Sequence, residues 1–409
     1  MKFGGTSVAD LERIRRVARL VQVEAARGAV AVVVSAMAGK TNELVAWTDA
    51  AGAADPQLPL CDDEYDTVVA SGEQVTAGLL AMTLRNLGVP ARSWLGWQVP
   101  IITDDAHGRA RIDDIPPEAL CAAIDGGEVA VVAGFQGVSR AGRISTLGRG
   151  GSDTTAVAIA AAIKASSCDI YTDVDGVHTT DPRIEARARR LDQISYEEML
   201  EMASLGAKVL HTRSVEMAMA HNVPVRVLSS FREPGDVALG TIVCDEEEIV
   251  EKRIVSGVAF SRDEAKISLY GLPDHPGVSS ELFGRLADGN VNVDMIVQSH
   301  ARSEGAANLE FTVGKRDAAR AVEIVRAGQA AIGFLELTVD EEVAKVSVIG
   351  VGMRSHAGVA KTMFTALAEK GVNIQVISTS EIKISVLIDA AYTELAVRAL
   401  HSAYGLDKA

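Results

Sequence analysis

Short runs of β-branched residues alternate with longer alanine-rich stretches from the start of the chain to about Cys244. The pattern predicts strands at 30–35, 129–134, 169–172 and 225–228 and helices at 11–23, 154–165 and 195–203. Runs that are apolar at every position are typical of strands buried on both faces, as in a parallel sheet covered by helices. We therefore expect residues 1–245 to form an α/β domain with an open, mostly parallel sheet sandwiched by helices.

An acidic run from Asp245 to Glu248 interrupts this pattern and predicts a solvated linker over residues 246–256. The chain beyond it repeats. Ile267-Ser268-Leu269-Tyr270-Gly271 is echoed by Val346-Ser347-Val348-Ile349-Gly350, and Val291-Asn292-Val293 by Val372-Asn373-Ile374. Gly277 and Gly358 are 81 residues apart, as are Asn292 and Asn373. The order of predicted elements in each copy indicates two ferredoxin-like βαββαβ domains, over 257–339 and 340–409.

Composition limits the possible partners and compartments. The formal net charge is −15 and no basic stripe is evident, which argues against nucleic acid as a partner. No apolar run approaches the length of a membrane span, and no secretory signal opens the chain, so we expect a cytoplasmic protein away from membranes. The four cysteines are scattered without a Cys-x-x-Cys pair, which predicts reduced thiols and no metal site.

The first motif is Lys2-Phe3-Gly4-Gly5-Thr6-Ser7, placed where a first strand should end. Paired glycines let the backbone approach a ligand closely, and the N-terminus of the following helix favours an anion. Lys2 would add a positive charge. An ordinary glycine turn is the alternative when this motif is taken alone.

Gly39-Lys40-Thr41 looks like the end of a phosphate-binding P-loop, but Val34 stands where that motif needs its first glycine. A strand that ends at Ser35, with Thr41 after it, is better suited to presenting hydroxyls at the carboxyl edge of a sheet, where α/β proteins bind ligands. Ser71-Gly72-Glu73 is weak alone, because a glutamate that opens a helix is commonplace.

A denser motif runs from Thr146 to Thr155 and includes Gly148-Arg149-Gly150-Gly151-Ser152-Asp153. It misses the dinucleotide fingerprint, because Asp153 stands where the third glycine is required. A second anion-binding loop before a helix fits better. Arg149 could hold a carboxylate with its planar guanidinium, and Asp153 could orient a lysine.

An acidic, hydroxyl-rich loop follows the strand at 169–172 and runs from Tyr171-Thr172-Asp173 to Asp181-Pro182-Arg183. The spacing of Asp173 and Asp175 invites a calcium site, but the rest of an EF-hand ligand set is missing. Lys208, in a segment that the pattern assigns to a helix, would by default be a surface residue.

In their order and spacing, these motifs resemble the aspartate kinases of the amino-acid kinase family, and the resemblance extends over essentially the whole chain. It implies an amino-acid-kinase fold followed by two ACT domains, and transfer of the γ-phosphoryl group of ATP to the β-carboxylate of L-aspartate. The product would be 4-phospho-L-aspartate, on the way to lysine, threonine, methionine and isoleucine. Magnesium would be bound through the ATP phosphates rather than by protein carboxylates.

The resemblance also assigns roles to individual residues. The catalytic set is Lys2, Asp153 and Lys208. The ATP-binding set is Lys2, Phe3, Gly4, Gly5, Tyr171, Thr172, Asp173, Asp181 and Arg183. The aspartate-binding set is Ser35, Thr41, Glu73, Arg149, Gly150, Gly151 and Ser152. Lys2 and Lys208 would supply positive charge at the γ-phosphate, Arg149 would bind a substrate carboxylate, and Glu73 would accept the substrate ammonium.

Paired ACT domains imply feedback regulation by lysine, threonine or both. The expected effector residues are Asp274, His275, Gly277, Val278, Asn292, Val293, Asp294 and Gln298, with Asn373, Ile374, Ser380 and Glu381 opposite. Glycine and asparagine turns without a ligand are the plainer interpretation. The resemblance further suggests an ACT-mediated homodimer, or a heterotetramer with a shorter regulatory subunit.

Two alternative functions stay open, and the sequence departs from the family pattern at one point. The alternatives are a kinase of the same family that acts on glutamate, acetylglutamate, carbamate or a nucleotide, and a non-catalytic amino-acid sensor of the same shape. The departure is that only Met1 precedes Lys2, where the family has several apolar strand residues. We therefore expect the first strand to be nearly absent.

Overall fold

The computed structural model describes residues 1–52, 63–206, 209–235, 240–249, 253–301, 305–356 and 358–408. The chain divides into two compact units. The first contains residues 1–177, 190–204 and 208–251, and the second contains 178–189, 205–207 and 252–409. Unlike the expected division near residue 245, these units are discontinuous in sequence, because a stretch that lies between two strands of the first unit belongs to the second.

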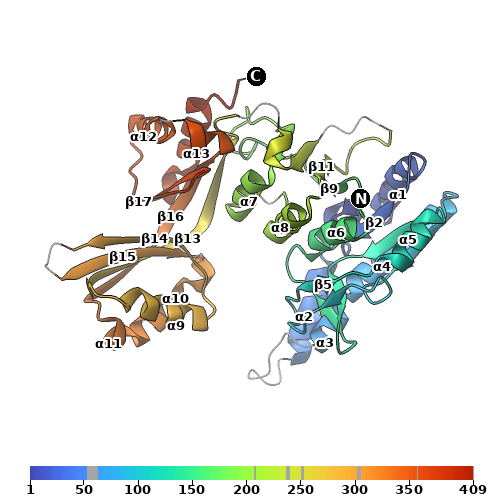
Figure 1. Ribbon diagram of the computed structural model, residues 1–409, viewed down its shortest axis with the longest axis horizontal. Helices are drawn as coiled ribbons and strands as arrows, with labels where there is room; N and C mark the ends of the chain where they lie inside the picture. Colours follow the sequence, from blue (N-terminus) through green and yellow to red (C-terminus); the bar gives the residue numbers. More distant parts are fainter. Residues whose placement is uncertain are drawn as a thin grey trace. The chain divides into compact units, whose positions relative to one another are not determined.

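The first unit is built on an eight-stranded sheet in the order β10-β12-β11-β9-β1-β2-β6-β3 (Figure 1). Its strands are β1 (Lys2–Phe3), β2 (Ala31–Val34), β3 (Ala91–Trp94), β6 (Val129–Ala133), β9 (Cys168–Thr172), β10 (Gln193–Ser195), β11 (Val225–Ser229) and β12 (Thr241–Cys244). All neighbouring pairs are parallel except β11 and β12. The expected open, mostly parallel sheet is confirmed.

Helices cover both faces of this sheet. The helices of this unit are α1 (Leu11–Ala25), α2 (Lys40–Gly52), α3 (Asp63–Val69), α4 (Ser71–Asn86), α5 (Glu118–Asp125), α6 (Gly151–Ala162), α7 (Tyr196–Ser204) and α8 (Thr212–His221), of which α2 and α3 pack against α4 and, for α3, the smaller sheet. Because side chains alternate along a strand, Val32 and Val34 face the core that α1 and α4 complete, whereas Val33 faces the side of Ile159 on α6. All five residues of β6 are buried, as expected for a central parallel strand.

Strand β1 is only two residues long, yet it lies between β2 and β9 in the middle of the sheet. Lys2 pairs with Val33 and Ile170, and Phe3 pairs with Val34 and Tyr171. The first strand is therefore short, as expected, but fully paired. Its register brings the Gly4-Gly5 turn to the carboxyl edge of the sheet, beside the ends of β2 and β9.

A smaller four-stranded sheet stands apart from the main one, in the order β5-β4-β7-β8. Its strands are β4 (Ile102–Thr103), β5 (Ile112–Asp114), β7 (Gln136–Ser139) and β8 (Ile144–Thr146). Strand β7 follows β6 after only Gly134 and Phe135, and β8 leads through Leu147 to Gly150 into α6. This sheet therefore supplies the chain that enters the glycine-rich loop.

The second unit contains a six-stranded antiparallel sheet in the order β14-β15-β13-β16-β18-β17. Its strands are β13 (Gly257–Pro273), β14 (Val293–His300), β15 (Ala306–Val313), β16 (Glu336–Ile349), β17 (Val376–Thr379) and β18 (Lys383–Asp389). Its helices are α9 (Val278–Asp288), α10 (Lys315–Ala327), α11 (Gln329–Ile332), α12 (Val359–Glu369) and α13 (Thr393–Ala403). Gly277 and Gly358 precede α9 and α12 with φ of 105° and 99°, so the internal repeat extends to backbone conformation.

The two repeats share their central strands. Residues 264–270 of β13 pair with 336–343 of β16 in the first module, and 257–261 pair with 345–349 in the second. Val255 and Val258 accordingly lie in the hydrophobic core formed with α12 and α13, whereas Ala265 and Ile267 lie in the core formed with α9 and α10. The expected first ACT domain, 257–339, thus gives its opening residues to the second core. Figure 1 shows these helices grouped at the two ends of the long strands.

Residues 178–189 pack within the second unit although they connect β9 to β10 of the first. The Thr179 carbonyl accepts a hydrogen bond from Val258 N at 2.8 Å, and Thr179 Oγ1 lies 2.8 Å from the buried His401 Nε2. Arg187 donates to Asp407 at 2.7 Å, and Arg189 donates to the Leu406 carbonyl at 3.0 Å. Arginines of this stretch thus make several of its contacts within the second unit.

Candidate functional site

Lys2 and Asp153 form an ion pair at the carboxyl edge of the main sheet. Lys2 Nζ lies 2.5 Å from Asp153 Oδ1, and Lys2 is only 9% exposed. Asp153 lies in the first turn of α6, which begins at Gly151 rather than after residue 153 as the sequence suggested, because Gly150 turns the chain directly into the helix. A lysine held by a carboxylate beside a helix N-terminus is suited to meeting a phosphate.

The Gly4-Gly5 turn lies directly beside the Lys2 ammonium. A Cβ at Gly5 would lie 3.0 Å from the Ala36 carbonyl oxygen, and one at Gly4 would lie 3.3 Å from Lys2 Nζ. The turn is closed by a hydrogen bond from Ser7 N to the Gly4 carbonyl at 2.9 Å. A side chain at Gly5 would crowd the backbone of the neighbouring loop, and one at Gly4 would crowd the lysine ammonium, so glycine suits a close-fitting anion site here.

The loop after β2 is tied to the start of α4. Ser35 N donates to the Phe3 carbonyl at 3.0 Å, and the next amide, Ala36 N, donates to Glu73 Oε1 at 2.9 Å. Gly72 permits this contact, since a Cβ there would lie 2.8 Å from Ala36 Cβ. Ser35 and Glu73 are far apart in sequence but lie close together in the structure, and both belong to the set expected to bind aspartate.

Glu73 is a buried carboxyl group with an unused oxygen. It is 3% exposed, and Oε2 has no hydrogen-bond partner in the part of the chain that the structure describes. Burial raises the pKa of Glu73 to about 7, although the hydrogen bond from Ala36 opposes the rise. A carboxylate left in this condition is stabilised by any cation that binds against it.

The glycine-rich loop has a conformation that other residues would not tolerate. Gly150 has φ of 69°, and a Cβ there would lie 2.1 Å from His211 Cγ. Gly151 is closed in by Phe135, with 2.7 Å between a Cβ and Phe135 Cδ2. Arg149, by contrast, is exposed and makes no hydrogen bond or ion pair with any described residue. Its guanidinium is therefore available to a ligand.

Two residues expected to bind ATP have side chains that are buried in the core instead of facing a ligand. Phe3 and Tyr171 are both fully buried, and their rings stack with centroids 4.6 Å apart. The Tyr171 hydroxyl accepts a hydrogen bond from Arg232 at 3.1 Å, and burial raises the pKa of Tyr171 to about 12. These rings hold β1 against β9, so only their backbone is left for a nucleotide.

The remaining residues of the expected catalytic and ATP-binding sets come from three segments of the chain. Thr172 and Asp173 lie at the carboxyl end of β9 and bond to each other at 3.1 Å. Asp181 and Arg183 belong to the second unit and pair with each other at 2.7 Å, which holds the pKa of Asp181 below its usual range. Lys208 lies outside the described residues. Thr172 and Asp173 thus lie at the same sheet edge as the Gly4-Gly5 turn, whereas Asp181 and Arg183 belong to the other unit.

Family models and curated relatives show which proteins this chain resembles. Residues 1–229 match the amino acid kinase family, and residues 267–328 and 346–404 match an ACT domain. An aspartokinase from Pseudomonas aeruginosa is 54% identical over 408 residues, which cover 99% of this chain and 97% of that protein. The chain belongs to the aspartokinase family.

Solved aspartokinase structures share the fold as well. E. coli aspartokinase III in complex with aspartate and ADP matches with a TM-score of 0.80 at 30% identity, covering 98% of both chains. The same enzyme in complex with lysine and aspartate matches with a TM-score of 0.77 at 30% identity, covering 99% of this chain and 98% of that one. The alternative of a kinase from another branch of the family is thereby set aside.

The ACT residues expected to bind effectors lie in turns, on the edge strand β14 and, for Val278, at the start of α9. Asp274 approaches His300 Nδ1 at 3.3 Å, and Gln298 accepts a hydrogen bond from Ser279 at 3.4 Å. Asp294 reaches the ammonium of buried Lys345, which also lies 2.9 Å from Glu264 Oε1. The set as a whole is Asp274, His275, Gly277, Val278, Asn292, Val293, Asp294, Gln298, Asn373, Ile374, Ser380 and Glu381.

Three members of this set have apolar side chains that pack, wholly or in part, against a core. Val278 is buried in the first module and Val293 packs partly against the same core. Ile374 packs partly against the core of the second module. These residues therefore offer an effector mainly their backbone groups, whereas the asparagines of the two repeats are exposed.

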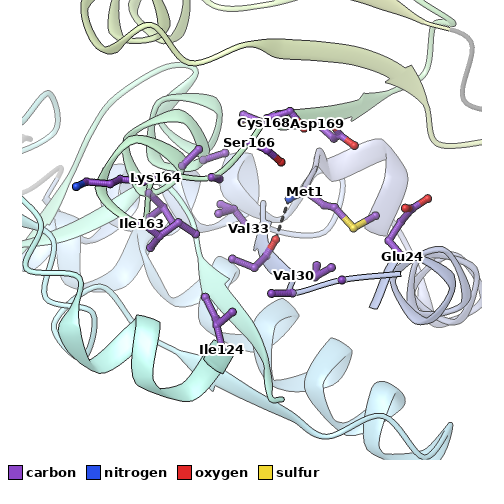
Figure 2. A pocket seen from close by; sticks show the side chains of 18 of the residues that line it. Met1, Glu24, Val30, Val33, Ile124, Ile163, Lys164, Ser166, Cys168 and Asp169 are labelled. Atoms are coloured by element: carbon purple, nitrogen blue, oxygen red, sulfur yellow. Dashed lines mark hydrogen bonds between the residues drawn. The ribbon is translucent and has the colours of Figure 1, made fainter. Parts of the chain in front are cut away.

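A pocket of about 560 Å³ lies at the opposite edge of the main sheet (Figure 2). It opens at the amino ends of β2 and β9, beside Met1, whose ammonium donates to the Ala31 carbonyl at 2.8 Å. Apolar side chains such as Val33 and Ile163 line it, with Asp169 at the rim. Ligands of open α/β sheets bind at the carboxyl ends of strands, so we do not assign the aspartokinase reaction to this pocket.

Several features bear on other classes of site. Cys121, Cys168 and Cys244 are free thiols, and burial raises the pKa of Cys168 to about 12. Across the described ranges, three or more His, Cys, Asp or Glu side chains nowhere gather as metal ligands. In the same ranges, no helix has the length and apolar character needed to cross a bilayer.

Proposed function

We propose that this aspartokinase uses the Lys2 site to phosphorylate the β-carboxylate of L-aspartate with ATP. A carboxylate oxygen of aspartate attacks the γ-phosphorus, the bond from that phosphorus to the bridging oxygen breaks, and ADP leaves. Such a transfer between anions depends on positioning and on positive charge at the γ-phosphate. The observation that carries the proposal is the ion pair of Lys2 with Asp153 beside the glycine turn and the α6 N-terminus.

The residues of the site divide into a phosphate side and an aspartate side. Lys2 would neutralise charge on the γ-phosphate, with Asp153 fixing its position, and the amides of the Gly4-Gly5 turn would donate to phosphate oxygens. Glu73 would accept the aspartate ammonium, and Arg149 would bind a substrate carboxylate through two parallel hydrogen bonds. Ser35 and Thr41 would lie at the boundary, and Lys208 would add a second positive charge. Magnesium would be carried by the ATP phosphates, with water completing its shell.

The reaction is tested by trapping the acyl phosphate with hydroxylamine. The hydroxamate should form with ATP and L-aspartate and should not form when either is omitted. Comparable product from L-glutamate, or none from L-aspartate, would contradict the assignment. Arg149→Ala and Glu73→Ala should each raise the KM for aspartate and leave the KM for ATP nearly unchanged; the opposite pattern would reverse our division of the site.

We further propose that lysine, threonine or both inhibit the enzyme through the ACT modules. Support comes from the intact turns of both repeats and from the lysine complex of the E. coli relative. A coupling of about 1–3 kcal/mol between effector and substrate sites is typical of such regulation. Activity at subsaturating aspartate should fall when lysine, threonine or their mixture is added, and unchanged activity under all three conditions would refute the proposal.

Assembly and location complete the proposal. We expect the ACT modules to join two copies of the chain, or a chain and a shorter regulatory subunit, and light scattering after gel filtration measures this directly. A monomer at micromolar concentration would exclude both. The free thiols and the use of ATP favour a reducing, cytoplasmic location.

A further inference from the structure

A buried carboxylate outside the substrate site organises the approach to the glycine-rich loop. Asp66, on α3, is 0% exposed and accepts hydrogen bonds from two other segments of the chain. His107 Nδ1 lies 2.8 Å from Oδ2, Gly108 N lies 3.0 Å from Oδ1, and Thr146 N lies 2.9 Å from Oδ2. The Thr146 hydroxyl also donates to Oδ1. We call Asp66, His107, Gly108 and Thr146 the Asp66 cluster.

Each group in the Asp66 cluster has a defined part in the bonding. An ionised carboxylate only accepts, so His107 must carry its proton on Nδ1. Four donors around two oxygens give the buried charge the compensation that it needs. The cost of burying this charge is therefore met only while α3, the 107–108 turn and the end of β8 stay in place together.

The cluster fixes the point from which the glycine-rich loop departs. Leu147, directly after Thr146, donates to the Phe135 carbonyl at 2.9 Å and accepts a hydrogen bond from Arg213 at 2.5 Å. Arg213 also donates to the Ala110 carbonyl at 3.0 Å. The loop is thus clamped at Thr146 and Leu147 on one side and enters α6 at Gly151 on the other.

Arg149 lies between these two clamped points. Gly148 packs close to the 107–108 turn, since a Cβ there would lie 3.2 Å from the Gly108 carbonyl oxygen. The Arg149 side chain itself has no partner among the described residues, so its position depends on the backbone that carries it. Bidentate binding of a carboxylate tolerates little displacement, and a misplacement of about 1 Å can cost about 100-fold in rate.

We propose that Asp66 is a positioning residue for aspartate binding, which acts by holding the Thr146–Gly150 loop so that Arg149 faces the substrate carboxylate. The inference rests on the proposed function, specifically on the role of Arg149. Asp66 is not among the residues assigned to either substrate. Replacing it with asparagine keeps the shape, but turns an NH₂ group toward backbone and side-chain donors that need an acceptor.

The test compares Asp66→Asn and Thr146→Val with Asp63→Asn in the full-length enzyme. Asp63 lies on the same helix but pairs with Arg143 at the surface, so it controls for a general effect of changing α3. Asp66→Asn should raise the KM for aspartate about 10- to 100-fold while the KM for ATP changes less than twofold. Thr146→Val should raise the aspartate KM about 3- to 10-fold, and Asp63→Asn should leave both constants unchanged.

The possible results separate this inference from the function on which it rests. An aspartate KM within twofold of the wild type in folded Asp66→Asn overturns the positioning role, as does an equal rise in both KM values. If Asp66→Asn does not fold, Thr146→Val decides by the same criteria. Arg149→Ala, assayed in parallel, distinguishes the failures: a normal aspartate KM in that variant refutes the assigned role of Arg149 itself.

Discussion

The buried Glu73 carboxyl makes aspartate binding a proton-releasing event. Burial places its pKa at about 7 in the free enzyme, against an ordinary 4.5. About half of the molecules therefore carry the proton at pH 7, with the other oxygen unpartnered. When the aspartate ammonium binds against this group, the charged form is favoured and the proton leaves. We expect release of about 0.5 proton per bound aspartate at pH 7 and almost none at pH 9.

Isothermal titration calorimetry measures this release directly. Aspartate is titrated into the enzyme at pH 7 in phosphate and in Tris, whose ionisation enthalpies differ, and the slope of the observed enthalpy gives the number of protons. Glu73→Gln should abolish the release and raise the KM for aspartate about 10- to 100-fold, since a hydrogen bond to a charged group contributes about 1.5–3 kcal/mol. Glu118→Gln is the matched control, because Glu118 also lies in the first turn of a helix but is exposed.

The same pKa affects stability, with a defined sign. The raised value corresponds to about 3 kcal/mol, because each tenfold change in proton affinity equals about 1.4 kcal/mol. Between pH 4.5 and 7 the folded chain holds a proton that the unfolded chain has lost, so the free energy of unfolding falls as the pH rises through this window. Glu73→Gln should remove most of this fall. In the calorimetric experiment, uptake of protons when aspartate binds would refute this role of Glu73. Release of as many protons by Glu73→Gln as by the wild type would refute it as well.

Three further substitutions test separate parts of the structure. Lys2→Ala should lower kcat by at least about 100-fold with an unchanged circular dichroism spectrum, because its role is electrostatic; wild-type turnover would remove Lys2 from the mechanism. Gly150→Ala should lower kcat/KM by more than about 10-fold and should also lower the melting temperature. The new Cβ would lie 2.1 Å from His211 Cγ, and the positive φ at this position costs a residue other than glycine about 1–2 kcal/mol. Lys345→Met should destabilise the second unit in denaturant unfolding by about 3–5 kcal/mol because Glu264 loses its buried partner, and adding Glu264→Gln should restore part of this loss.

Part of the arrangement at the carboxyl edge could be predicted from the sequence because its motifs are local. The turns after the strands that end at Phe3 and Val34 must meet at one edge of a parallel sheet, so Lys2 and Ser35 could be grouped from the sequence. Asp153 was added only by the family resemblance, because α6 follows β8 of the smaller sheet. The sequence did not reveal on which face of the sheet a side chain lies. Phe3 and Tyr171 adjoin the motifs, yet they alternate into the core, and a two-residue strand is too short for its alternation to be recognised.

The missed features depend on contacts between distant segments. Asp66 stands in the run Asp63-Glu64-Tyr65-Asp66, whose composition is that of a solvated helix start, and only the structure brings Thr146 to it. The membership of residues 178–189 in the second unit likewise rests on long-range pairings such as that of Thr179 with His401. Propensity and periodicity carry no information about such pairings.

The shared strands of the ACT modules have a consequence for the order of folding. Gly257 pairs with Ile349, so the strand that opens the second module must wait until 92 more residues have been synthesised. Because the first module lies entirely within that interval, we expect it to close its own core earlier and to bring the two halves of the second sheet together. Most of the entropy of closing the long loop is then lost before the second module forms. The second module is completed last, on a template that the first provides.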